Sequence, residues 1–158
     1  MDVRLINPFV TSCRYVLTTM AKLKVDVGKP VLQNRKPAGF AVAATIDIAG
    51  SVEGTLVFGF PPEIAAMLTA GLLGEPVRAF DSSCLDAMGE VANMIAGAAK
   101  KDLPGGLCTM STPRIYLDRR TLPPAVGPVI VIPCLTAEGR FDIEVSLRKG
   151  RAAGGQAA

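Results

Sequence analysis

The chain has 158 residues, of which 49% are hydrophobic, and it carries a formal net charge of +3. This length suits one domain that buries roughly two-thirds of its surface, but no apolar run reaches the 18 or so residues of a membrane-spanning helix. The lysines and arginines are scattered, so a nucleic-acid-binding face is not expected. Because the chain has no histidine, Ser-His-Asp and Cys-His catalysis are excluded.

The four cysteines, Cys13, Cys84, Cys108 and Cys134, lie far apart and form no C-x-x-C pair. Without histidine, a zinc site of the usual type is not expected, and a disulfide framework is unnecessary at this length. The N-terminus also lacks the basic start and apolar centre of a secretory signal. We therefore expect no metal site, four small buried thiols and a cytoplasmic protein.

The first half of the chain predicts a helix, a strand, a hairpin and a short helix. Asn7 before Pro8 suits a helix start, and Lys24–Gln33 reads as a strand whose Gly-Lys-Pro marks a sheet edge or a bulge. Phe40–Ala49 and Val52–Phe60 alternate as a β-hairpin, and a helix over Ile64–Leu73 ends at a glycine. The first helix is expected to run to Met20 or Ala21 with an apolar stripe: Phe9, Val10, Cys13, Val16, Leu17 and Met20.

Asp81–Asp102 predicts one long helix, which Asp81 or Ser82 caps and Pro104 ends. Its core face gathers apolar residues at helical spacing: Leu85, Met88, Ala92, Ile95, Ala96 and Ala99. Residues three and four apart stack along a helix, so one stripe on the opposite side holds four residues: Asp86, Glu90, Asn93 and Gly97.

Two features distinguish this stripe from an ordinary solvated helix face. Gly89 and Gly97 each cost about 1 kcal/mol relative to alanine inside a helix, and bare backbone beside a carboxylate and a carboxamide lets another molecule approach closely. Met94 lies toward the same side, and its flexible thioether suits an adaptable contact surface. The alternatives are a face that is merely solvated and glycines that allow close packing within the fold.

The second half of the chain repeats the pattern of the first. Leu107–Leu117 predicts a strand that its proline makes irregular, Asp118–Gly127 a proline-rich loop, and Val129–Leu135 with Phe141–Leu147 a second hairpin. The last residues, 149–158, predict a disordered tail. Helix, strand and hairpin thus occur twice within one domain, residues 1–148. This order predicts an α+β fold, an antiparallel sheet with two long helices packed on one face.

Several segments of the chain carry a resemblance to a known family: INPFVTS, GKPVL, SVEGTLVFGFP, LLGEPV and LDAMGEVANMIAGAAKKDL. In this order, from Asp2 to Leu147, the chain resembles the CheX branch of the CheC/CheX/FliY chemotaxis phosphatases. The family motif, Asp or Ser, then Glu four residues on and Asn three further, is met by Asp86, Glu90 and Asn93. CheC-type proteins carry the motif on both long helices.

The first helix here has no glutamate and no second asparagine, so the resemblance implies one site per chain. Its polar residues are expected on the solvated side of that helix: Thr11, Ser12 and Arg14. The resemblance also implies a homodimer, and we expect neither nucleic acid nor membrane among the partners.

The resemblance implies that the protein dephosphorylates a phosphorylated CheY-type response regulator. Asn93 would orient the attacking water and Glu90 would pair with the regulator's active-site lysine, roles that suit side chains which do not titrate near pH 7. Mg²⁺ would come with the regulator, and the protein would need no cofactor of its own. The expected partner-binding residues are Asp86, Gly89, Met94 and Gly97.

Two other functions stay open at this point. The domain could bind a response regulator or another signalling protein without hydrolysing anything, in which case removing the Asn93 carboxamide would leave the phosphate lifetime unchanged. It could also be a small-ligand sensor that uses the apolar interior of the sheet, although core packing explains that aliphatic content better.

Overall fold

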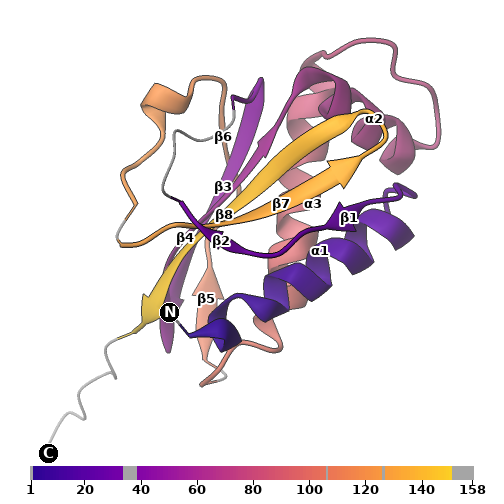
Figure 1. Cartoon of the computed structure of the whole chain (residues 1–158). Helices are drawn as coiled ribbons and strands as arrows, with labels where there is room; N and C mark the ends of the chain where they lie inside the picture. The colour runs from indigo at the N-terminus through magenta and orange to yellow at the C-terminus, as the bar shows by residue number, and fades with distance from the viewer. Residues whose placement is uncertain (1, 34–38, 106, 126, 151–158) are drawn as a thin grey trace, which may run out of the picture.

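The computed structural model describes residues 2–33, 39–105, 107–125 and 127–150. Within them, eight strands form one antiparallel sheet (Figure 1). The strands are β1 (Asp26–Val27), β2 (Val31–Leu32), β3 (Val42–Gly50), β4 (Val52–Phe60), β5 (Cys108–Met110), β6 (Arg114–Tyr116), β7 (Ile130–Thr136) and β8 (Gly139–Lys149). Their order is β1-β7-β8-β4-β3-β5, while β2 also pairs with β7 and β6 with β3.

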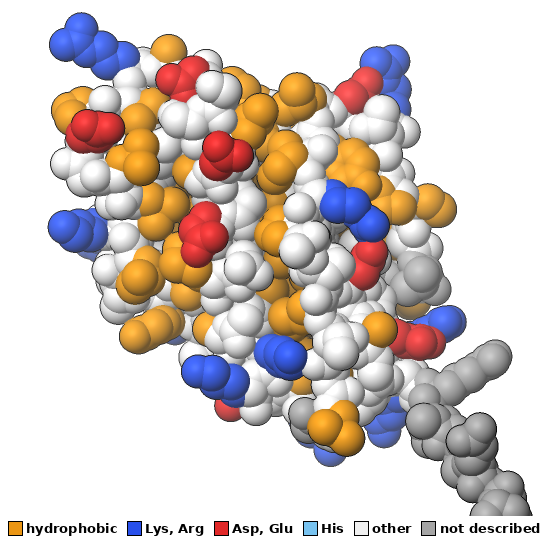
Figure 2. Space-filling view, turned by 180° about the vertical axis from the view of Figure 1, so that it is seen from behind, with side chains coloured by type: hydrophobic (Ala, Val, Ile, Leu, Met, Phe, Trp, Pro, Cys, Tyr) orange, Lys and Arg blue, Asp and Glu red, His pale blue; other side chains and the backbone are white. Residues whose placement is uncertain are grey.

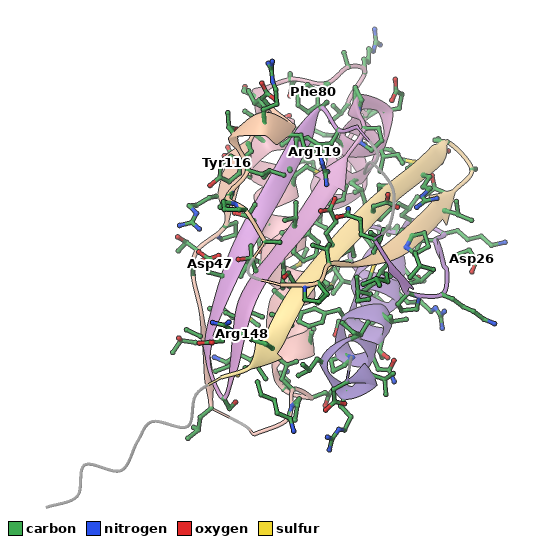
Figure 3. The ribbon with its side chains drawn as sticks, turned by 60° about the vertical axis from the view of Figure 1, so that its left-hand side comes forward. Asp26, Asp47, Phe80, Tyr116, Arg119 and Arg148 are labelled. Carbon is green, nitrogen blue, oxygen red and sulfur yellow. The ribbon has the colours of Figure 1, made fainter. Side chains whose placement is uncertain are left out.

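The helical elements are η1 (Val3–Leu5), α1 (Asn7–Thr19), α2 (Pro62–Leu73), α3 (Ser82–Lys100) and η2 (Arg119–Thr121). The two long helices α1 and α3 lie together behind the sheet in Figure 3, so the predicted α+β architecture with both helices on one face is confirmed. The short helix α2 packs against α3 and ends, as predicted, at Gly74 in the left-handed conformation.

The two halves of the chain exchange their edge strands across the sheet. β1 and β2 of the first half pair with β7 of the second, whereas β5 and β6 of the second half pair with β3 of the first. The two remaining hairpin strands, β4 and β8, meet at the centre, where Leu56 lies opposite Val145. The predicted repeat of helix, strand and hairpin therefore produces a sheet whose halves are interlocked.

Each predicted irregular strand is split into two short ones. The first breaks between β1 and β2 at Gly28-Lys29-Pro30, and the second breaks between β5 and β6 around Pro113. A proline has no N–H to donate to a sheet ladder, so it is tolerated at an edge or a break. Across the second break the backbone N–H of Ser111 still donates to the carbonyl of Asp47, at 2.9 Å, so the segment stays attached to β3.

The hydrophobic core fills the space between the sheet and the two long helices. The rings of Phe60 and Phe141 pack at 5.2 Å between centroids on the helix-facing side of β4 and β8. The largest buried side chains come from every layer: Phe9, Leu17, Ile46, Leu56, Phe58, Ile64, Leu68, Met88, Ile95 and Ile132. α1 and α3 are therefore held on a continuous packed surface.

The start and the flanks of α1 differ from the sequence prediction. Asn7 is not the N-cap: Ile6 holds that position in right-handed helical conformation, because the short helix η1, capped by Asp2, runs directly into α1. Ser12, expected on the solvated side, is buried, and Met20, expected in the core stripe, is half exposed just past the end of α1. Hydrophobic periodicity fixes the main buried face but not the edges that neighbouring elements cover.

The face of the sheet away from the helices is partly covered by the segment after β6. Three polar residues of β8 on that face, Asp142, Glu144 and Ser146, are buried, although their alternation with apolar residues is typical of a solvated face. The side chain of Arg119, labelled in Figure 3, forms an ion pair with Glu144 and lies 5.6 Å from the centroid of the Phe40 ring.

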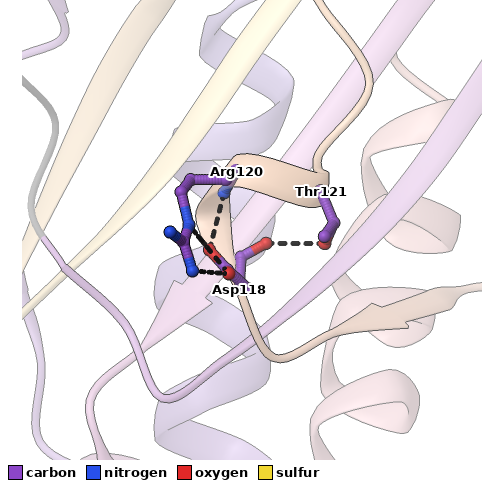
Figure 4. A network of polar contacts seen from close by, with 3 residues as sticks. All are labelled: Asp118, Arg120 and Thr121. Atoms are coloured by element: carbon purple, nitrogen blue, oxygen red, sulfur yellow. Dashed lines mark hydrogen bonds and ion pairs between the residues drawn. The ribbon is translucent and has the colours of Figure 1, made fainter.

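The turn η2, inside the predicted proline-rich loop, positions Arg119. Figure 4 shows how Asp118 caps it: the backbone N–H and the guanidinium of Arg120 donate to the Asp118 carboxylate, and the Thr121 hydroxyl donates to the Asp118 carbonyl. This local network fixes the turn, so the neighbouring arginine is aimed at the sheet.

The last strand of the sheet extends slightly beyond the predicted domain boundary. β8 runs to Lys149, one residue past the predicted boundary, and residues 151–158 of the predicted tail lie outside the described residues. No helix in the described part of the chain is long and apolar enough to cross a bilayer.

Candidate functional site

The site is built on α3, and its first turn is fixed by Asp81. The Asp81 backbone is extended, and its carboxylate accepts a hydrogen bond of 2.9 Å from the backbone N–H of Ser83 and another from the Ser83 hydroxyl. These bonds lower the pKa of the Asp81 carboxyl group. α3 therefore begins at Ser82, with the N-cap that the sequence predicts.

One side of α3 is anchored in the core along its whole length. The buried residues recur at helical spacing: Cys84, Ala87, Met88, Val91, Ala92, Ile95, Ala96 and Ala99. Of the predicted core face, only Leu85 is no more than partly buried. A helix packed in this way cannot rotate about its axis without exposing apolar surface, so the direction of its outer side chains is fixed.

The predicted stripe on the opposite side is exposed. Asp86, Glu90, Asn93 and Gly97 are all solvent-accessible, and the first three side chains make no hydrogen bond or ion pair with another residue that the structure describes. Glu90 and Asn93 are three residues apart, which places their Cβ atoms about 5–6 Å from each other on one face. The structure thus presents an unpaired carboxylate and an unpaired carboxamide side by side.

The two remaining residues of the predicted set border the stripe. An added Cβ at Gly89 would lie 3.6 Å from Ile115 Cδ1 and 3.8 Å from Pro113 Cβ, so Gly89 faces the segment of β6. Met94 is partly buried and packs against the core. Both lie beside the exposed residues, and their contact with a partner remains a prediction.

The sequence did not indicate that Ile115 belongs to this neighbourhood. Ile115 lies opposite Ala44 of β3, on the helix side of the sheet, and its side chain is 37% exposed. The irregular strand was predictable from its proline, but its pairing with β3 is a long-range contact that no local pattern encodes.

The charge of this side of the molecule limits what it can bind. In Figure 2, which views the molecule from behind, acidic side chains stand separately among hydrophobic and uncharged ones, and lysines and arginines lie mostly near the outline. Within α3 the only cationic residue is Lys100, in the last turn. The stripe itself therefore offers hydrogen-bond donors and acceptors and negative charge, but no cation for an anionic group.

The described residues contain no group of three or more His, Cys, Asp or Glu side chains that could hold a metal ion.

A cavity of about 230 Å³ lies on the other face of the sheet, between β4, β8 and the segment after η2. Glu144, Ser146 and Thr55 line it, and it is separate from the stripe on α3.

The sequence model of the chemotaxis phosphatase CheX family matches residues 42–135 of the chain. The chain belongs to the CheX family. The match includes α3 with all of the stripe and the first hairpin, formed by β3 and β4.

Individual relatives extend this likeness to nearly the whole chain. The CheY-P phosphatase CheX of Thermotoga maritima is 25% identical over 154 residues, which cover 95% of this chain and 99% of the relative. The crystal structure of a CheC-like superfamily protein from Shewanella sp. PV-4 superposes with a TM-score of 0.83 at 30% identity, over 94% of this chain and 99% of the other.

A third relative is a chain of the CheX-CheY-BeF₃-Mg²⁺ complex from Borrelia burgdorferi. It superposes with a TM-score of 0.78 at 24% identity, over 92% of this chain and 98% of that chain. At this identity the likeness concerns the fold. The fold class and the family that the sequence predicted are therefore confirmed.

Proposed function

We propose that this CheX-family protein hydrolyses the aspartyl phosphate of a CheY-type response regulator, with Asn93 orienting the attacking water and Glu90 pairing with the regulator's active-site lysine. The observation that carries the proposal is the pair itself: an exposed carboxylate and an exposed carboxamide, without partners among the described residues, one turn apart on a helix anchored in the core. A relative that matches nearly the whole chain is a CheY-P phosphatase.

The proposed hydrolysis requires little covalent participation by this chain. An aspartyl phosphate is an acyl phosphate, so water attacks phosphorus in line, the bond between phosphorus and the carboxylate oxygen breaks, and the products are the free aspartate and inorganic phosphate. In such a loose transition state the main requirement is to position the nucleophile. The Asn93 carboxamide oxygen can accept a hydrogen bond from the water while its N–H₂ donates to a neighbouring oxygen.

The absence of cations on the stripe agrees with a division of labour between the two proteins. The phosphoryl group and its Mg²⁺ would both be held by the regulator, as BeF₃ and Mg²⁺ occur together with CheY in the Borrelia complex. Glu90 provides the negative charge that attracts a lysine, and because it stands one turn from Asn93, that ion pair would also set the register in which the amide enters the pocket.

Two further features belong to the same proposal. We infer a homodimer from the family resemblance. The exposed apolar side chains of Val31 and Leu32 on the edge strand β2 are surface that a second copy could cover.

We also place the protein in the cytoplasm, where its proposed partner would be phosphorylated and where four unpaired thiols would persist.

The test is a phosphate-release assay with candidate CheY-type regulators phosphorylated by a small phosphodonor. The wild-type protein should shorten the lifetime of the phosphorylated regulator, and Asn93→Ala should remove that effect while it retains binding to the BeF₃-activated regulator. Thr11→Ala, an exposed change on α1, is the control and should behave as wild type. If wild type binds the activated regulator without shortening the phosphate lifetime, the domain is a non-catalytic binding module.

A further inference from the structure

Three glycines lie inside the helices, and packing within the described chain requires a glycine at only one of them. An added Cβ at Gly71 of α2 would lie 2.0 Å from the carbonyl oxygen of Ala21, a clash that only glycine avoids. At Gly89 it would lie in ordinary contact with Ile115 and Pro113. At Gly97 it would meet no atom within 4 Å, so nothing within the described chain requires a glycine there.

The backbone gives no reason for this glycine either. Gly97 lies inside the continuous helix α3 and is not among the glycines with positive φ, so alanine could adopt the same conformation. Glycine in the interior of a helix is less favourable than alanine because it loses more backbone entropy on folding. Gly97 is thus a destabilising choice that the isolated chain does not need.

Gly97 occupies a specific place on the stripe. It is four residues after Asn93 and seven after Glu90, so it continues their line along the exposed face of α3. Asn93 has a short side chain, and its carboxamide can reach the phosphoryl group of another protein only if that protein comes close to the helix surface. The residue next along the line would then be covered.

We propose that Gly97 is a positioning residue for the proposed reaction: the missing side chain lets the response regulator lie close enough to α3 for Asn93 to reach the phosphoryl group. This rests on the proposed function for the identity of the partner. A methyl group at position 97 separates the two surfaces and weakens docking, although it stabilises the free protein.

The experiment compares Gly97→Ala with wild type and with Thr11→Ala, which replaces an exposed β-branched residue of α1 by a better helix former. Three quantities are measured: the thermal unfolding midpoint, the Kd for a regulator activated with BeF₃⁻ and Mg²⁺, and the KM and kcat for its phosphorylated form. Gly97→Ala should raise the midpoint by about 2 to 4 °C and raise Kd and KM at least tenfold, with kcat changed less than threefold. Thr11→Ala should raise the midpoint and leave Kd within twofold.

The outcomes separate this proposal from the function beneath it. If wild type binds the activated regulator without hydrolysing the phosphorylated one, the phosphatase function fails, but the Kd of Gly97→Ala still decides the role of Gly97. The proposed role of Gly97 is overturned if Gly97→Ala binds the activated regulator within twofold of wild type. It is also overturned if the unfolding midpoint of Gly97→Ala is lower than that of wild type, which would reveal a structural need for glycine, or if the wild-type protein binds none of the regulators.

Discussion

The Asp81 carboxylate accepts hydrogen bonds from both the backbone N–H and the hydroxyl of Ser83, and this contact sets where α3 begins. Packing against the core sets the direction of Glu90 and Asn93, and the cap keeps the first turn of the same helix formed. Two residues outside the stripe thereby contribute to the stability of the helix that carries it.

Replacing Asp81 by alanine should lower the thermal unfolding midpoint by about 2 to 4 °C. Asparagine, which can also cap the helix, should lower the midpoint much less. The folded pKa of Asp81 lies below its usual value of 3.8, so its stabilising effect is present above that pH and is lost as the pH falls through the folded pKa. Midpoints of wild type and Asp81→Asn measured from pH 7 to pH 3 check this. A wild-type midpoint that falls no further than that of Asp81→Asn below pH 4 would contradict the capping role.

The Glu90 carboxylate should act through its charge. Glu90→Gln keeps the size of the side chain and removes the negative charge, so we expect about a tenfold weaker Kd for the activated regulator and a smaller dependence of Kd on salt. Titrations at two ionic strengths measure both effects. An unchanged Kd with unchanged salt dependence would mean that Glu90 pairs with no cation of the regulator.

Hydrolysis should not tolerate a carboxylate in place of the Asn93 carboxamide. Asn93→Asp has nearly the same shape, but it brings negative charge to the phosphoryl oxygens and cannot donate a hydrogen bond. We expect hydrolysis to fall at least a hundredfold, by an amount close to that of Asn93→Ala, with weaker binding than Asn93→Ala shows. Single-turnover phosphate release measures the first and a binding titration the second. Wild-type rates in the aspartate variant would mean that the amide N–H₂ is not needed.

The ion pair between Arg119 and Glu144 should stabilise the covered face of the sheet. Their side chains are 26% and 11% exposed, so Arg119→Ala leaves a mostly buried carboxylate without this partner and should cost about 2 kcal/mol in the free energy of unfolding. Urea denaturation measures this, and the control is Arg14→Ala, which removes an exposed arginine of α1 and should change the free energy of unfolding little. Equal effects of the two variants would show that burial of the pair contributes nothing.

The thiols should be unreactive in the folded protein. All four cysteines are buried, and the Cys13 and Cys134 sulfur atoms lie 3.6 Å apart between α1 and β7. The hydrogen bond with Cys13, together with burial, raises the pKa of the Cys134 thiol, so little thiolate exists near neutral pH. A thiol reagent at pH 7.5 should label the chain only after urea is added. Rapid labelling of Cys13 or Cys134 without urea would show that α1 separates readily from the sheet.

The sequence was sufficient for the features that depend on local order. The position of α3, its cap at Asp81 and the exposure of Glu90 and Asn93 all follow from helical spacing and capping chemistry. The split of the irregular strands could be expected from Pro30 and Pro113 but not located, because the break depends on which N–H groups the neighbouring strand can use.

Contacts between distant segments could not be predicted in this way. Glu144 alternates with apolar residues and therefore reads as solvent-facing, yet the segment around Arg119 covers it. Ser12 is buried and Met20 is half exposed, the reverse of the prediction. The reason is the same, because the position of neighbouring elements decides which side chains are covered. The closeness of Gly89 to Ile115 likewise depends on a strand pairing that only the fold reveals.

The most direct test of Asn93 as the residue that directs water is the lifetime of a phosphorylated CheY-type regulator with and without this protein. We predict that a catalytic amount of wild type shortens the lifetime at least tenfold and that the same amount of Asn93→Ala, with Kd for the BeF₃-activated regulator within threefold of wild type, leaves it at its spontaneous value. Equal acceleration by both proteins would contradict the assignment.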